Sequence, residues 1–115
     1  MAATNYTPDF GGISAAMSKG DATMVSKYFD SKVDLMVLGA ENKLDRTGAT
    51  GELKRFFGSN SVSSFALMHQ GVSQDKVSHY GIGDMSAGGK VYRVFVYLRE
   101  VGGQFLIQEL RIEKK

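Results

Sequence analysis

The side chains with the clearest potential for chemistry are the two histidines, which lie ten residues apart in the stretch LMHQGVSQDKVSHY. Histidine is a common metal ligand and the usual acid–base residue near neutral pH. A hairpin whose turn is centred on residues 74–75 places His69 opposite Tyr80, so that His79 belongs to the other face of the sheet. Only a loop of odd length would bring both to one face, and two ligands still fall short of a zinc site. We therefore expect no metal site here and regard both histidines as separate structural or surface residues.

The elements that position these side chains follow from the apolar pattern. Two short helices are expected within the first 30 residues, the second capped by Asp21, and a third helix over residues 45–58. VDLMVLG (33–39) has apolar residues on both faces, which is typical of a buried strand. Four more strands are expected after Ser61, in SVSSFALMHQGV, VSHYGIGDMS, KVYRVFVYLRE and QFLIQELRIE. Helices followed by a meander of strands predict an α+β fold in one domain over residues 1–115, with helices packed on one face of an antiparallel sheet and residues 1–8 as a flexible tail.

The register of the last hairpin can be predicted from its alternation. A two-residue Gly-Gly loop would set Val96 opposite Glu109, whereas a three-residue loop sets Val96 opposite Gln108 and Val94 opposite Leu110. A slip of one residue exchanges the two faces, so the apolar pattern favours the three-residue loop. The predicted apolar face carries Tyr92, Val94, Val96, Leu98, Leu106, Gln108, Leu110 and Ile112. The predicted mixed face carries Arg93, Phe95, Tyr97, Arg99, Phe105, Ile107, Glu109 and Arg111.

Composition excludes several classes of function. The net charge is +2, and the basic residues are scattered apart from Lys54-Arg55 and the terminal lysine pair, so no nucleic-acid partner is expected. No segment approaches eighteen consecutive apolar residues, so no membrane partner is expected either. The N-terminus shows no signal peptide, and the chain has no cysteine, which excludes disulfides, thiolate catalysis and cysteine zinc sites. The compartment stays open.

Several stretches together resemble a known family. They are SKGDATMVSKYFDSKVDLMVLG, the pair Phe56-Phe57, FALMHQGVS, HYGIGDM, YRVFVYLRE and FLIQELRIEKK, which cover roughly residues 12–113. This combination is similar to a small bacterial family labelled domain of unknown function 4783, within the nuclear-transport-factor-2-like superfamily. The resemblance implies a curved sheet wrapped around helices to form a cone with an internal cavity. Members often carry an export signal, which implies a periplasmic native form. The match is poorest at residues 44–54, and the family offers no catalytic residue to transfer.

The cone fold hosts both enzymes and binding domains, so the expected function depends on the cavity. Tyr92 and Gln108, with Val94 and Val96, are the predicted ligand-binding residues, and neither polar group is a plausible general base at neutral pH. The leading hypothesis is a non-catalytic binding or dimerisation module without a cofactor, which holds an apolar small molecule or binds a protein partner.

The alternative hypothesis is a cofactor-free lyase or isomerase. Such an enzyme needs an acid or histidine inside the cavity, and Asp34 and His69 are the weak candidates. Asp84 lies near a predicted turn, and Glu109 has Arg93 and Arg111 as expected charge partners, so both have simpler structural explanations. The direction in which Asp34 and His69 point decides between the two hypotheses.

The mixed face predicts a homodimer. Phe95, Tyr97, Phe105 and Ile107 would form an apolar patch on the side of the sheet away from the helices, which soluble monomers usually avoid. The surrounding arginines and Glu109 resemble the polar rim of an interface. A tail or loop that covers this face is the competing explanation.

Overall fold

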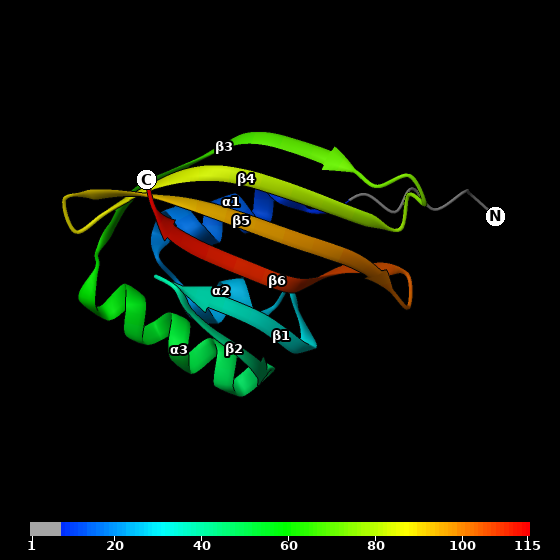
Figure 1. Cartoon of the computed structure of the whole chain (residues 1–115), viewed down its shortest axis with the longest axis horizontal. Coiled ribbons are helices and arrows are strands. Elements are labelled where there is room, and N and C mark those ends of the chain that lie inside the picture. Colours follow the sequence, from blue (N-terminus) through cyan, green and yellow to red (C-terminus); the bar gives the residue numbers. More distant parts are fainter. Residues whose placement is uncertain (1–7) are drawn as a thin grey trace.

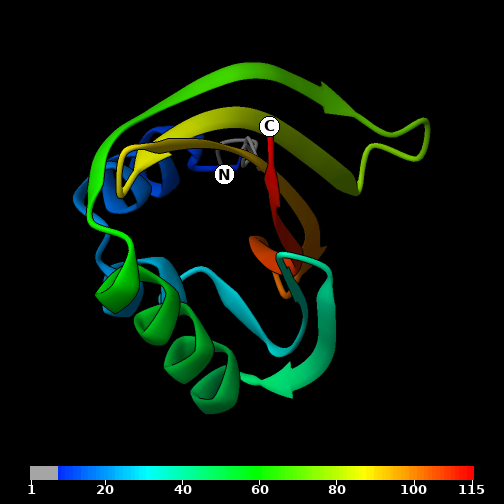
Figure 2. The same ribbon diagram turned by 60° about the vertical axis from the view of Figure 1, so that its left-hand side comes forward.

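The computed structural model describes residues 8–115, and in these residues three helices precede and flank a six-stranded sheet. The elements are α1 Phe10–Lys19, α2 Ala22–Ser26, β1 Phe29–Val37, β2 Ala40–Asp45, α3 Arg46–Ser59, β3 Val62–Val72, β4 Ser78–Ala87, β5 Lys90–Val101 and β6 Gln104–Lys114. The sheet curves around the helices, which lie on its concave side (Figures 1 and 2). The predicted α+β architecture is therefore confirmed. The predicted tail falls outside the described residues except for Pro8.

Short polar residues fix the ends of the helices. Asp9 caps α1 by accepting a hydrogen bond from the backbone N–H of Gly12 (2.8 Å), and Gly20 ends this helix in a left-handed conformation (φ 61°). Asp21 caps α2 and Asp45 caps α3 in the same way as Asp9. The side chains satisfy N–H groups that have no partner within the helix. Gly20 thus ends one helix and Asp21 starts the next, and the cap at Asp21 is the one that the sequence predicts.

Strand β2 was missed by the sequence prediction, which expected a polar break after residue 39. Only Leu44 of AENKLD is even half-buried, so the strand shows no apolar alternation. A tight turn at Leu38 and Gly39, both with positive φ (52° and 89°), folds β2 back onto β1. This geometry is that of a two-residue hairpin turn.

The sheet is mixed rather than wholly antiparallel. The strand order is β2-β1-β6-β5-β4-β3, and β1 runs parallel to β6 whereas every other neighbouring pair is antiparallel. The pairing of β1 with β6 brings the first strand of the chain beside the last one (Figure 1).

The predicted register of the last hairpin is wrong because β6 contains a β-bulge. Gly102 and Gly103, with φ 58° and 86°, form a two-residue turn, and Val101 pairs with Gln104. Leu98 pairs with Ile107, but the next residue, Tyr97, pairs with Glu109, so Gln108 is an extra residue. From there on Val96 pairs with Leu110 and Val94 with Ile112. The bulge lets a two-residue turn coexist with an apolar inner face, which an unbroken alternation does not allow.

The bulge changes the face of three predicted site residues. Phe105 and Ile107 are only 8% and 0% exposed, and they belong to the core, so their assignment to the mixed face is wrong. Ile107 and Leu110 are both buried although they are three residues apart. A regular strand would place them on opposite faces, and the extra residue Gln108 allows both to face the core. Gln108 does not lie on the apolar face and contacts Asp30 instead, so its assignment to the apolar face is also wrong.

The concave side of the sheet is packed against the helices. Tyr92, Val94 and Val96 lie on this side, as predicted, and all three are at most 2% exposed. The ring of Tyr92 meets Phe56 edge-on at 5.3 Å, and its hydroxyl donates to Asn60 Oδ1 (3.2 Å). These residues are thus part of the hydrophobic core, and the tyrosine hydroxyl has a protein partner.

In the described residues no helix is long and apolar enough to cross a membrane.

Candidate functional site

The two histidines lie on opposite faces of the sheet, as predicted. His69 pairs with Ile82 on the face away from the helices, which we call the outer face. His79 pairs with the buried Leu98 on the other side, and its ring meets Phe105 edge-on at 4.7 Å. Each pair is shifted from the predicted one because the innermost pair of the hairpin is Val72 with His79, so that six residues, 73–78, separate the paired residues. Over residues 8–115 no group of three or more His, Asp or Glu side chains is placed to hold a metal ion.

One half of the outer face, on β4 and β5, contains an apolar cluster. We call its residues on β4 and β5 the aromatic strip; they are Tyr80, Ile82, Phe95 and Tyr97. Tyr80 pairs with Tyr97 and Ile82 with Phe95, and the rings of Tyr80 and Phe95 stack at 6.3 Å. The Arg111 guanidinium lies 5.7 Å from the centre of the Phe95 ring, a cation–π contact. Phe95 and Tyr97 therefore lie on the face that the sequence predicted.

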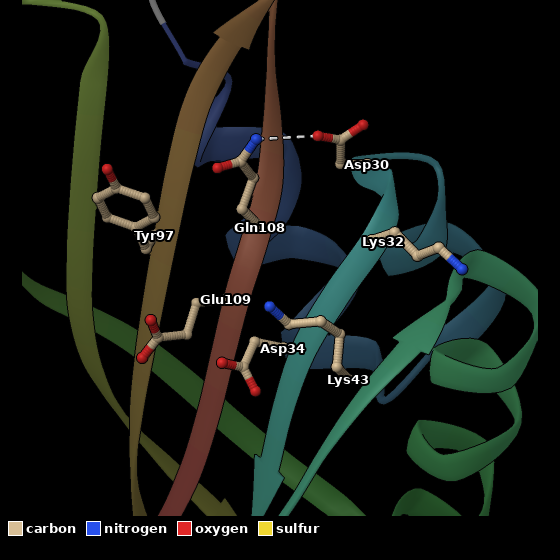
Figure 3. Close-up of a pocket in the computed structure, with 7 residues that line it drawn as sticks. All are labelled: Asp30, Lys32, Asp34, Lys43, Tyr97, Gln108 and Glu109. Carbon is tan, nitrogen blue, oxygen red and sulfur yellow. Dashed lines mark hydrogen bonds between the residues drawn. The ribbon is translucent and has the colours of Figure 1, made fainter.

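The other half of the outer face contains a hollow of about 300 Å³, shown in Figure 3. We call it the polar pocket. Its walls come from β1, β2, β5 and β6, and in Figure 3 the blue helices lie behind the sheet while the green helix α3 lies at the right, beside β2. The lining residues are Asp30, Lys32, Asp34, Lys43, Tyr97, Gln108 and Glu109.

The polar pocket exists because β1 and β6 separate. Phe29 pairs with Ile107, and the next pair along the ladder is Asp34 with Glu109, so residues 30–33 have no partner on β6. On the other side of β6, the bulge sets both Gln108 and Glu109 against Tyr97. Bulges often re-aim a side chain next to functional sites. Gln108 Nε2 donates to Asp30 Oδ2 across the opening (2.9 Å).

Acidic and basic side chains lie close together in this region. Glu109 accepts a hydrogen bond from the Arg111 guanidinium, as its predicted charge partner. Lys43 extends toward Asp34 and Glu109 in Figure 3. A hydrogen bond between the Asp34 and Glu41 carboxyl groups raises the pKa of Glu41, and the charge of Asp34 raises it further.

We expect the carboxyl group of Glu41 to titrate above the ordinary pKa of glutamate. Its pKa is raised in the folded protein, so the folded state holds the proton more tightly than the unfolded state does. This stabilisation is present at low pH and is lost as the pH rises through the folded-state pKa of Glu41. NMR detection of the side-chain carboxyl carbon measures the midpoint. Asp34→Asn should bring it back toward the ordinary value, whereas Glu113→Gln, at an exposed position of β6, should leave it unchanged. An unaltered midpoint in Asp34→Asn would show that Asp34 is not the cause.

The predicted acids all lie on the outer face. Asp34 lines the polar pocket and His69 is exposed, so neither lies beside Tyr92. Asp84 lies within β4 rather than at a turn, and a hydrogen bond from Lys115 Nζ (2.6 Å) lowers its pKa. The sequence prediction missed Asp30, Lys32 and Lys43. Lys43 could have been found by recognising β2, and the other two only from the interruption of the ladder.

Comparisons with known proteins identify the relatives of the chain. A family model described as "Domain of unknown function (DUF4783)" matches residues 10–113. A DUF4783 family protein of known crystal structure from Bacteroides ovatus is 34% identical, with a TM-score of 0.87 and coverage of 95% of this chain and 96% of that chain. None of the curated proteins matches the chain.

More distant structures share the fold alone. An NTF2-like protein of unknown function from Shewanella baltica is 14% identical over 92% of this chain and 87% of that chain, with a TM-score of 0.68. A domain of unknown function with a cystatin-like fold from Nostoc punctiforme is 9% identical over 92% and 72% of the two chains, with a TM-score of 0.71.

Proposed function

Since the chain belongs to the DUF4783 family, whose function is unknown, we propose a function from its own surface: a non-catalytic binding module that forms a homodimer through the outer face of the sheet. The family predicted from the sequence motifs is confirmed, and so is the NTF2-like fold. The observation that carries the proposal is the aromatic strip, which lies on the side of the sheet away from the helices.

The composition of the aromatic strip supports an interface. Tyr80 is 38% exposed and stacks on Phe95, and the other residues of the strip are partly buried, so the exposed apolar surface of the strip centres on Tyr80. Exposed apolar clusters on soluble proteins often mark interaction sites. Tyrosine, phenylalanine and arginine are the residue types enriched at the centre of interfaces, and Arg111 lies against Phe95.

A second copy of this chain is the partner that the charges favour. Arg93 and Arg99 lie on the outer face of β5 and are exposed. The acids Asp34, Glu41 and Glu109 lie on the same face, on β1, β2 and β6. A two-fold axis through this face can set the arginines of one copy against the acids of the other, so that the face is complementary to itself.

The other two hypotheses have less support. A ligand on the concave side would have to displace side chains, because Tyr92, Val94 and Val96 are packed in the core. A lyase or isomerase using Asp34 or His69 needs a desolvated acid or base. Both residues lie on the outer face instead, and His69 is exposed. Binding through the outer face requires neither displacement of core side chains nor a desolvated acid or base.

We expect wild-type protein to sediment as a dimer at tens of micromolar and Phe95→Glu to sediment as a monomer. A charge in the centre of an interface would weaken association by at least about 30-fold, the scale of an interface hot spot. Val72→Glu is the matched control, because Val72 is 53% exposed and pairs with His79, away from the aromatic strip. Circular dichroism checks that both variants fold. A monomeric wild type, or a Phe95→Glu variant that dimerises like Val72→Glu, would contradict the proposal.

A further inference from the structure

The polar pocket offers a ligand hydrogen-bond acceptors and donors in near balance. Asp30, Asp34 and Glu109 contribute acceptors, while Lys32, Lys43 and Gln108 contribute donors. With three carboxylates and two ammonium groups, the lining has a formal charge of −1. An ion of either sign would be attracted by one set and repelled by the other. A neutral molecule rich in hydroxyl groups suits both sets, because each hydroxyl donates one hydrogen bond and accepts others.

An aromatic ring forms one side of the polar pocket. The Tyr97 hydroxyl donates to Ser78 Oγ (2.8 Å), and Ser78 is buried, so the ring is held at its far end. In Figure 3 the ring of Tyr97 lies on β5, and Gln108 and Glu109 lie on the neighbouring strand β6. The face of an aromatic ring carries partial negative charge and attracts the weakly positive C–H groups of an apolar ligand surface. A single ligand in the pocket can therefore hydrogen-bond to the polar groups and pack against the aromatic ring at the same time.

The polar pocket is built on strands rather than on loops. Its groups come from β1, β2, β5 and β6, and the Gln108–Asp30 hydrogen bond holds two of them in place. Gln108 retains a second N–H and its carbonyl oxygen for a ligand. A site whose side chains are already ordered loses less conformational entropy on binding. The volume of about 300 Å³ lies at the small end for ligand pockets, which limits the ligand to a small molecule.

We propose that the polar pocket binds a neutral sugar ring. Hydroxyl groups of the sugar donate to the Asp34 and Glu109 carboxylates and accept from Lys43 and Gln108. The C–H face of the ring packs on Tyr97. This site shares Tyr97 with the aromatic strip, and its acids Asp34 and Glu109 belong to the face through which the dimer is proposed, so the two proposals use overlapping surface.

The test is a titration of isotopically labelled protein with D-glucose, D-galactose, D-mannose and N-acetyl-D-glucosamine, followed by ¹H–¹⁵N NMR. At least one sugar should produce saturable shifts centred on residues 30–34 and 107–109. Glu109→Gln should weaken this binding by about tenfold, since a hydrogen bond to a charged acceptor is lost. Glu113→Gln is the matched control, because Glu113 lies on the same strand outside the polar pocket, and it should bind like wild type.

Further variants separate the sugar site from a general polar surface. Tyr97→Ala should lose binding, whereas Tyr97→Phe should retain most of it because the ring is kept. The titration is repeated on Phe95→Glu, because a monomeric variant leaves the pocket open to solvent whether or not wild type dimerises. Sugar binding is therefore tested independently of the dimer proposal. The proposal is overturned if no sugar of the panel binds saturably to Phe95→Glu, or if Glu109→Gln and Tyr97→Ala bind like wild type. Free glycine and lysine serve as charged comparison ligands, and binding of these amino acids in place of the sugars would also overturn it.

Discussion

Ile107→Ala should lower the free energy of unfolding by about 2–4 kcal/mol, whereas Leu106→Ala should lower it by about 1 kcal/mol or less. Ile107 is fully buried and pairs with Leu98 on the concave side of the sheet. Its neighbour Leu106 pairs with Arg99 and is only partly buried. Truncating a buried isoleucine removes apolar contacts and leaves a cavity, while truncation on the outer face leaves space open to water.

Urea denaturation of the two variants and the wild type measures this difference. The pair is sensitive because the sequence-based register assigns the faces in reverse, with Leu106 inside and Ile107 outside. A larger loss of stability in Leu106→Ala than in Ile107→Ala would restore that register and remove the bulge at Gln108. Equal losses would mean that neither side chain is preferentially buried.

Phe29→Ala should have a still larger effect, lowering the free energy of unfolding by about 3–5 kcal/mol. The Phe29 side chain is fully buried and pairs with Ile107 at the start of the parallel ladder between β1 and β6. Residues 30–33 have no backbone partner on β6. Near this end of β1 the contacts to β6 are the Phe29–Ile107 pair, the backbone bond from Ile107 N–H to the Tyr28 carbonyl (2.6 Å) and the Gln108–Asp30 hydrogen bond. The Phe29 carbonyl oxygen also accepts hydrogen bonds from the Arg46 guanidinium (3.0 and 3.3 Å), which tie β1 to α3.

Met36→Ala is the matched control, because Met36 lies on the same strand, on the outer face, and is only partly buried. It should lower the stability by about 1 kcal/mol or less. Thermal denaturation followed by circular dichroism compares the two variants. A domain of this size has a total stability of about 5–15 kcal/mol, so Phe29→Ala should melt well below wild type. A melting temperature for Phe29→Ala as high as that of Met36→Ala would show that β1 is anchored elsewhere.

The sequence allowed the prediction of most elements because their apolar periodicity is strong. Tyr92, Val94 and Val96 alternate without interruption, so the concave face of β5 was correctly predicted. The strand QFLIQELRIE is different, because apolar residues occupy both alternations before Gln108 and one alternation after it. A pattern analysis that keeps one alternation throughout cannot detect an extra residue. The interval between Ile107 and Leu110 is visible only once both are known to be buried.

The candidate site was predicted less completely than the fold. Asp34 and Glu109 were recognised as unusual acids, but their adjacency arises from the parallel pairing of β1 with β6, which brings together distant segments. Local periodicity contains no information about which strands become neighbours. Lys43 lies on a strand that has no apolar alternation, so it was assigned to a loop. The polar pocket results from two interruptions of regular strand pairing, the gap between β1 and β6 at residues 30–33 and the bulge at Gln108. Neither interruption can be predicted from the amino-acid composition.

The position of β6 in the sheet has a consequence for the order of folding. Strand β6 lies between β1 and β5, yet it follows both in the chain, and Asp30 and Gln108 bond across 78 positions of sequence. A chain still being synthesised cannot unite β1 and β2 with the rest of the sheet until residues 104–114 have been made. Until then Phe29 and Leu35 lack their partners on β6, and the free edge of β1 can pair with another chain. Contacts of such long range also slow folding, since the intervening loop must close first. Nascent chains of this protein are therefore most in need of a chaperone just before the last strand is complete.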